Sequence, residues 1–307
     1  MRLSSFIRAV AAGCAFAAAL AAVPARAQTV FAPVDDLEFD RPESWALKYF
    51  TSGILMTGLE MPEAPTPGSL RIGFDFAWIP SLSAAQEKVG FNGTKQEDLN
   101  KAPVFGRPRV SVALPGRFLL TVAGNPPIST FGVTPKFLGA AIAHSITEGA
   151  GWNLGWRVSG QGGTAKAAFT CPQDVLAFTP GDPGNSYGCR QTSSDTATLR
   201  FVSGELDGWR RLQGMHGLSP HFTVALTYMN NVFQVNAYTF NFIDQTRLLA
   251  SGVTVAGSGG VEYPLTDRIS ASVDVFYTPL TVTRPPATSS SLEGMFNVRG
   301  LVSYRVR

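Results

Sequence analysis

The chain has 307 residues, of which 45% are hydrophobic and 15% are charged, and its formal net charge is +3. Residues 1–27 hold three arginines and no acidic residue, so residues 28–307 carry 22 basic side chains (25 minus 3) against 22 acidic ones. This balance, without a Lys/Arg run or stripe, gives no indication of nucleic-acid binding. Residues 28–307 also lack an apolar stretch of about 18 residues, which excludes a transmembrane helix.

Residues 1–27 have the pattern of a signal peptide. Arg2 and Arg8 supply positive charge, and an apolar run too short for a membrane span follows them. The segment ends in the small-x-small sequence Ala-Arg-Ala at Ala27. We therefore expect export, cleavage and a mature chain that begins near Gln28.

Two stretches come next along the chain. Residues 28–44 follow no regular pattern and are expected to be irregular. Residues 45–57 alternate in a strand-like manner and are interpreted as a strand. The predicted organisation is a signal peptide, an irregular N-terminal segment over residues 28–44, and a β-domain over residues 45–307.

Strict alternation begins at Leu70. Even positions are apolar and rich in aromatic residues: Leu70, Ile72, Phe74, Phe76 and Trp78. Odd positions are small or charged: Arg71, Gly73, Asp75 and Ala77. A period of two places each set on one face of a strand. The stretch from Trp152 to Val158 repeats the pattern.

The same alternation recurs to the C-terminus. Further apolar rows cover residues 110–114, 118–122, 138–146, 222–228, 253–263, 269–277 and 296–306. Residues 196–212 are the least regular, and we expect a strand there as well. A long apolar face opposite a polar and charged face is typical of strands with lipid on one side and a polar lumen on the other.

Connections between these rows alternate in length when they are followed from the C-terminus. The long ones cover residues 280–292, 232–248, 171–195 and 80–107, and residues 124–133 are intermediate. The short ones cover residues 264–267, 213–219, 147–151 and 114–117. Outer-membrane barrels have short periplasmic turns and longer extracellular loops.

The leader, the alternating rows, the loop lengths and the last strand together resemble bacterial outer-membrane β-barrel proteins. The chain departs from that class in ending on Arg307, three residues after its last aromatic residue, Tyr304. The resemblance implies an all-β fold: an antiparallel transmembrane β-barrel of about 10–12 strands with short periplasmic turns and long extracellular loops. A secreted soluble β-protein stays as the alternative, since soluble antiparallel sheets alternate too.

The number of strands leaves three interpretations open. Ten strands are expected from residue 69 onward, and residues 45–57 make an eleventh. Single-chain bacterial barrels have even numbers of strands. Either residues 28–44 hold a twelfth strand, or they plug the lumen, or residues 45–57 are not part of the wall.

Polar side chains on the other strand face are the candidate functional residues. The lumen-lining candidates are Arg71, Asp75, Arg109, Arg157, Asp274 and Arg299, with Asn153, Gln161, Asn297 and Arg305 in the same rows. Two roles are open for them. They either pair across a narrow lumen and fill it, since an unpaired buried charge is costly, or they form a polar path or binding site for a small solute.

Two cysteines, Cys171 and Cys189, remain after the leader is removed. An even number of cysteines in an exported chain favours a disulfide, which would close a Pro- and Gly-rich loop. A reactive or metal-binding pair is the alternative, but no histidine lies nearby in the sequence. We therefore predict a structural disulfide.

No motif for covalent chemistry, a metal or a cofactor stands out. Membrane-embedded lipid hydrolases place a His and a Ser two residues apart, and the nearest match is His221 with Thr223. Acidic residues in the long loops, such as Glu97 and Asp98, could hold calcium, but a solvated loop accounts for them too. The expectation is therefore no enzyme, no metal and no cofactor.

Apolar residues of the long connections 80–107 and 232–248, together with Phe131 of residues 124–133, suggest an apolar mouth on the barrel. They are Phe91, Pro103, Val104, Phe105, Phe131, Val232, Phe233, Phe240 and Phe242. The leading hypothesis is an outer-membrane barrel that passes or binds a small polar or weakly hydrophobic molecule through a narrow polar lumen. A surface-interaction barrel with a closed lumen and, third, a lipid hydrolase are the alternatives. Expected partners are outer-membrane lipid, the barrel assembly machinery and a small solute.

Overall fold

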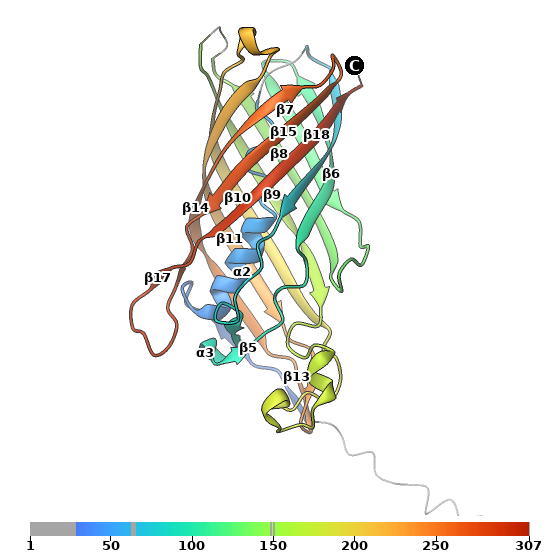
Figure 1. Cartoon of the computed structure of the whole chain (residues 1–307), viewed down its shortest axis with the longest axis vertical. Coiled ribbons are helices and arrows are strands. Elements are labelled where there is room, and N and C mark those ends of the chain that lie inside the picture. Colours follow the sequence, from blue (N-terminus) through green and yellow to red (C-terminus); the bar gives the residue numbers. More distant parts are fainter. Residues whose placement is uncertain (1–28, 63–65, 148, 150, 307) are drawn as a thin grey trace, which may run out of the picture.

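The computed structural model describes residues 29–62, 66–147, 149 and 151–306. The signal peptide predicted for residues 1–27 lies outside the described residues. Antiparallel strands form one closed barrel, in which each strand pairs with the next and the last pairs with the first (Figure 1). The ten wall strands are β3 (Leu70–Trp78), β6 (Val104–Leu114), β7 (Phe118–Asn125), β8 (Thr134–Ser145), β9 (Asn153–Ala167), β10 (Asp195–Trp209), β11 (Ser219–Gln234), β14 (Arg247–Pro264), β15 (Ile269–Thr278) and β18 (Met295–Arg305). The predicted barrel is confirmed.

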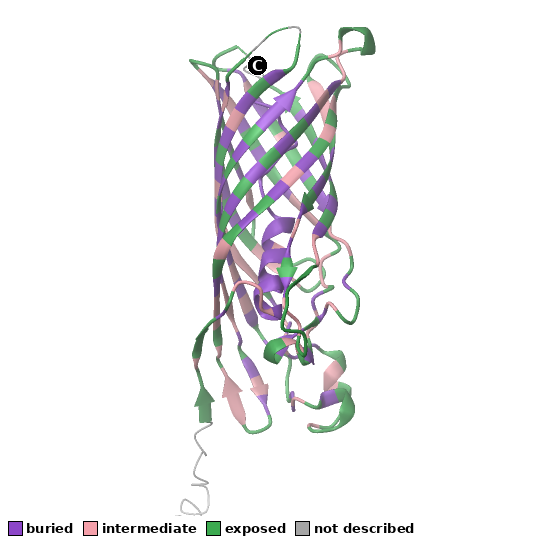
Figure 2. Cartoon of the chain, turned by 90° about the vertical axis from the view of Figure 1, so that its left-hand side faces the viewer, coloured by how far each residue is buried: buried purple, intermediate pink, exposed green. Residues whose placement is uncertain are grey.

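Side chains alternate between the two faces of the wall, as Figure 2 shows by its bands of buried and exposed residues. The apolar rows face outward, where Leu138, Val202 and Leu206 are 59–67% exposed. Aromatic residues such as Trp78, Trp152 and Tyr304 lie near the ends of this outer surface. An apolar outer surface bounded by aromatic residues is the surface that a barrel presents to lipid. Among the described residues, no helix is long and apolar enough to cross a membrane.

The two ends of the barrel differ. One end carries the C-terminus and short connections, among them η3 (Gln213–Met215) (Figure 1). The other end carries long loops with short elements: β4 (Lys88–Val89), α3 (Gly90–Gly93), β5 (Lys95–Gln96), η1 (Asp174–Ala177), η2 (Pro183–Asn185), β12 (Ala237–Thr239), β13 (Phe242–Asp244), β16 (Thr281–Val282) and β17 (Ser291–Leu292). By the predicted orientation, the long loops are extracellular.

The N-terminal segment lies at the extracellular end. Strand β1 (Thr29–Phe31) pairs with β13, and β2 (Val34–Asp36) pairs in parallel with the start of β14. Helix α2 (Pro42–Gly53) follows, and it lies inside the barrel (Figure 1). The strand predicted for residues 45–57 is therefore wrong, and the wall begins at β3 rather than at residue 45.

The chain continues through the lumen after α2. Its end, Pro62, lies at the periplasmic side, where a Cβ on Gly155 at the start of β9 would come within 2.4 Å of the proline ring. All residues from Pro42 to Pro62 are buried except the half-buried Phe50. We refer to residues 42–62 as the lumen segment.

Small inward residues of the wall make room for the lumen segment. Leu55 and Met56 pack in the middle of the barrel against wall residues that are mostly small: Ala123, Ala141, Ala225 and Ala256, with Phe201, Met229 and Phe276. At Gly139 of β8, a Cβ would come within 2.7 Å of the Met56 sulfur. The lumen segment, rather than wall side chains alone, therefore supplies much of the barrel's interior packing.

Candidate functional site

The predicted lumen residues all lie inside the barrel and are at most 8% exposed: Arg71, Asp75, Arg109, Arg157, Asp274 and Arg299. Asn153, Gln161 and Asn297 are buried there as well. Arg305 pairs in register with the inward-facing Arg71, but it lies at the periplasmic end of β18 and is exposed, so it does not line the buried lumen. Arg107, which was not predicted, joins the set as a fully buried side chain.

Three buried arginines hold the backbone of the lumen segment. Arg107 donates to the carbonyl oxygens of Ile54 (2.8 Å) and Leu55 (3.1 Å). Arg299 donates to the carbonyl oxygens of Ser52, Leu55 and Thr57 at 2.7–3.3 Å. Arg157 donates to the carbonyl oxygens of Gly58 and Glu60.

The acidic side chains of the wall balance these arginines. Asp75 accepts from Arg107 (3.0 Å) and pairs with Arg109 (3.1 Å). Asp274 accepts from the backbone N–H of Leu59 at 3.2 Å. The arginines and acids pair with one another and with the lumen segment. These contacts support the structural role, in which the predicted residues fill the lumen rather than form a path.

Glu60 ties the end of the lumen segment to the wall. Its carboxylate accepts from Ser111 (2.8 Å) and pairs with Arg71 (3.7 Å) and Arg109 (3.6 Å). Gly58 adopts φ +74°, and a Cβ there would come within 2.5 Å of the Ser258 hydroxyl. The lumen segment therefore occupies the space that a polar path through the barrel would need.

The His221–Thr223 pair does not have the geometry of a hydrolase. The His221 Nε2 atom lies 2.8 Å from Asp274, and the Thr223 hydroxyl donates to Asp207 at 2.7 Å. Both side chains are buried against the closed lumen. Among the described residues, no group of three or more His, Cys, Asp or Glu side chains could hold a metal ion.

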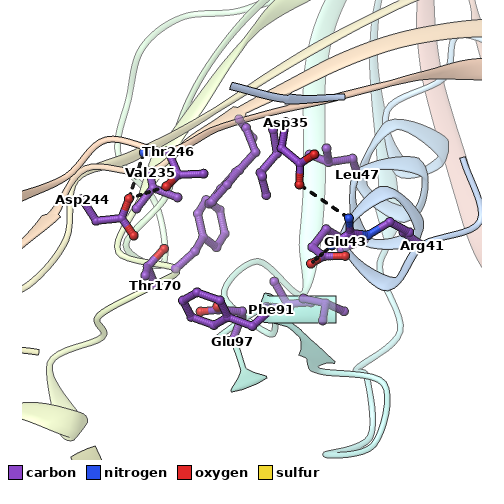
Figure 3. A pocket seen from close by; sticks show the side chains of 18 of the residues that line it. Asp35, Arg41, Glu43, Leu47, Phe91, Glu97, Thr170, Val235, Asp244 and Thr246 are labelled. Atoms are coloured by element: carbon purple, nitrogen blue, oxygen red, sulfur yellow. Dashed lines mark hydrogen bonds and ion pairs between the residues drawn. The ribbon is translucent and has the colours of Figure 1, made fainter. Parts of the chain in front are cut away.

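A second candidate site is a cavity of about 470 Å³ at the extracellular mouth, which we call the mouth pocket (Figure 3). Its walls come from the N-terminal segment, α2, the loop between β3 and β6, and the ends of β10, β11 and β14. Its apolar lining is Phe31, Pro33, Val34, Ala46, Leu47, Phe50, Val89, Phe91, Leu99, Phe169, Ala197, Phe233, Val235 and Leu248. A cavity of this size, with a mostly apolar lining and a few polar groups, is typical of small-molecule sites.

Polar groups stand at the edges of the mouth pocket. Figure 3 shows Asp244, Thr246 and Thr170 on one side and Asp35, Arg41 and Glu43 on the other. Glu97 lies between them, close to Phe91. Burial raises the pKa of Glu97 to about 7, although Lys95, 2.8 Å away, opposes the shift.

The disulfide loop covers one edge of this region. Cys171 and Cys189 are bonded, as predicted. Tyr187 of the same loop stacks on Phe91, with ring centroids 5.2 Å apart and planes 5° apart. Since Phe91 lines the mouth pocket, the disulfide loop is joined to the pocket's rim through this contact.

The prediction of an apolar mouth identified only part of this pocket. Phe91 and Phe233 line it, whereas Phe105, Phe131 and Phe242 do not. Half of the apolar lining that was missed comes from α2, which was interpreted as a strand, and from the N-terminal segment. Pro42 at the start of α2 and Glu43 in its first turn are helix-start signals that could have identified the helix.

Together, the closed wall, the apolar outer surface and the filled lumen define a plugged β-barrel of the outer-membrane class. No protein-family model matches the chain. No curated protein matches it in sequence.

Solved structures with similar folds are distant. The attachment invasion locus protein Ail of Yersinia pestis is 10% identical, with a TM-score of 0.31, and the match covers 78% of this chain and 99% of Ail. The outer-membrane protease OmpT of Escherichia coli is 13% identical, with a TM-score of 0.36 and coverage of 78% and 94%. The toluene transporter TodX of Pseudomonas putida is 8% identical, with a TM-score of 0.35 and coverage of 87% and 92%. Similarities this distant assign no role.

Proposed function

We propose that this chain is an exported outer-membrane barrel that binds a small, largely apolar molecule in the mouth pocket, without covalent chemistry. The observation that carries the proposal is the pairing of an apolar extracellular cavity with a filled lumen. A cleaved signal peptide would export the chain, and the barrel assembly machinery would insert it among outer-membrane lipids.

The polar lumen is the weaker candidate for the binding site. Its arginines and acids already pair with one another and with the lumen segment, so a solute would have to displace those contacts. The mouth pocket needs no such displacement, because its space is already present. A surface-interaction barrel with a closed lumen is the alternative, and it shares the filled lumen but needs no ligand in the pocket.

Binding of an apolar probe tests the proposal. Wild-type barrel in lipid nanodiscs is expected to bind methylnaphthalene saturably, measured by probe fluorescence with empty nanodiscs subtracted. Ala46→Phe should weaken binding about tenfold or more, because Ala46 lines the pocket and a phenyl ring there would occupy part of the space that the ligand needs.

Ala140→Phe is the matched control, since Ala140 is exposed on the lipid-facing side of β8. It should bind like the wild type. Heat-modifiable gel migration would check that both variants fold. Absence of saturable binding to the wild-type barrel would contradict the proposal and favour the surface-interaction alternative.

A further inference from the structure

The ionisable groups of the mouth pocket are mostly of one sign. Four carboxylates and one guanidinium line it: Asp35, Glu43, Glu97, Asp244 and Arg41. Arg41 lies between Asp35 (3.5 Å) and Glu43 (3.1 Å). Lys95, just outside the lining, pairs with Glu97 at 2.8 Å. Four carboxylates against these two cations leave the pocket with an excess of two negative charges when all are ionised.

Glu43 differs from the other three carboxylates in having a buried oxygen without a hydrogen-bond partner among the described residues. Its Oε1 atom accepts from Arg41 and, at 2.6 Å, from the backbone N–H of Asn92. Its Oε2 atom has no hydrogen-bond partner among the described residues, although the residue is only 7% exposed. A buried carboxylate oxygen without a donor costs free energy, and a ligand that supplies the donor would remove that cost.

Asp244 faces Glu43 from the opposite side of the pocket (Figure 3). Its described hydrogen bonds come from Thr246, through the backbone N–H at 2.9 Å and the hydroxyl at 2.5 Å. These donors are neutral, so they leave the charge of Asp244 uncompensated. A cation in the pocket would therefore find negative charge on both sides.

An anionic ligand would instead depend on Arg41, the cation that lines the pocket. The Nε atom of Arg41 also has no hydrogen-bond partner among the described residues. Its guanidinium, however, already contacts two carboxylates, so an anion placed beside it would be repelled by both. The pocket therefore favours a positive group over a negative one.

We propose that the mouth pocket binds molecules with an apolar body and a protonated amine, and that the amine donates to Glu43 Oε2. This inference rests on the proposed function and names its ligand class. The apolar lining takes the body of the ligand, and the carboxylates hold its head. A charge-assisted hydrogen bond to a carboxylate is among the stronger polar contacts in proteins.

Three ligands that share one ring system test the charge preference. Naphthylmethylamine is a cation at neutral pH, methylnaphthalene is neutral and naphthylacetate is an anion. Titrated into wild-type barrel in nanodiscs of uncharged lipid, the amine should bind about tenfold more tightly than the neutral ligand, and the anion most weakly. Tenfold corresponds to about 1.4 kcal/mol.

The variant Glu43→Gln tests whether the Glu43 carboxylate is the group that holds the amine. It should weaken amine binding about tenfold more than it weakens methylnaphthalene binding, because only the amine interacts with the carboxylate charge. Glu38→Gln is the matched control, since Glu38 lies just before α2, is exposed and does not line the pocket. It should leave both affinities unchanged.

The outcomes separate this inference from the proposed function. Equal binding of all three ligands, or tightest binding of the anion, overturns the amine preference while the pocket's role in binding stands. Failure of all three to bind overturns the proposed function as well. Should Glu43→Gln not fold, the order of the three affinities in the wild-type barrel decides, and Asp244→Asn serves as the second variant.

Discussion

The lumen and the mouth pocket are both built on the segment around α2, but their charged residues have different roles. In the lumen, arginines bind backbone carbonyls and pair with acids, so the charges hold the lumen segment in place. At the mouth, acids outnumber cations around an apolar cavity, and a carboxylate oxygen of Glu43 has no donor among the described residues. Buried charge stabilises the plug in the first region and leaves room for a ligand in the second.

A charged residue inside a barrel can therefore have one of two roles: it stabilises the fold, or it is available to bind a solute. Arg157 lies 3.6 Å from Glu205 and 3.9 Å from Asp207, and it also holds the lumen segment. Its charge is therefore compensated by the fold itself. Inward charge by itself is thus no sign of transport, and what matters is whether the fold already supplies each charge with a partner.

The largest effect is expected from Arg157→Met. The change leaves the carboxylates of Glu205 and Asp207, both fully buried, without their cation, and frees the carbonyls of Gly58 and Glu60. Removing one partner of a buried ion pair costs about 3–5 kcal/mol. We expect a fall of that size in the free energy of unfolding, measured by guanidinium titration in lipid vesicles.

Arg305→Met is the control for this change, because Arg305 is exposed at the periplasmic rim. It should alter the free energy of unfolding by about 0.5 kcal/mol or less. Equal stability of the two variants would mean that the buried arginine does not hold the lumen segment.

A smaller effect is expected at the mouth, from the titration of Glu97. Burial raises the pKa of Glu97 to about 7, above the ordinary value of 4.5 for a glutamate, with Lys95 opposing the shift. The folded loop therefore favours the protonated acid: its contribution is complete below the unfolded pKa and is lost as the pH rises through about 7. Amide hydrogen exchange over β4 and β5 should show faster local opening just above that pH than just below it.

Glu97→Gln should remove this pH dependence, because its amide does not ionise. Glu87→Gln, in the same loop, keeps Glu97 and should therefore keep the wild-type behaviour. A pH dependence that survives in Glu97→Gln would assign it to another group.

The sequence predicted the wall of the barrel well and its contents poorly. In rows such as Leu70–Trp78, apolar residues face the lipid and the residues between them face the barrel interior. This alternation needs no knowledge of what fills the lumen, so a period of two in the sequence is enough to identify the strand. Extending the row of Arg109 by one step would also have found Arg107, which the sequence analysis did not include.

Helix α2 was hidden for a physical reason. A helix enclosed on all sides needs no polar face, so it lacks the amphipathic pattern by which helices are recognised. Trp45, Leu47 and Tyr49 then mimic a strand. The inward alanines of the wall, such as Ala141 and Ala225, were the signal that something other than wall side chains fills the lumen.

The most direct test of this account is the conductance of the refolded mature chain, residues 28–307, in a planar bilayer. It tests whether the lumen is closed, which would leave the mouth pocket as the binding site. Folding would be checked first by heat-modifiable gel migration. We predict no steady open-channel current, because residues 42–62 fill the lumen and the arginines hold them there. A steady ohmic current from the folded wild-type barrel would contradict this, and would return the function to a polar path along Arg157 and Arg299.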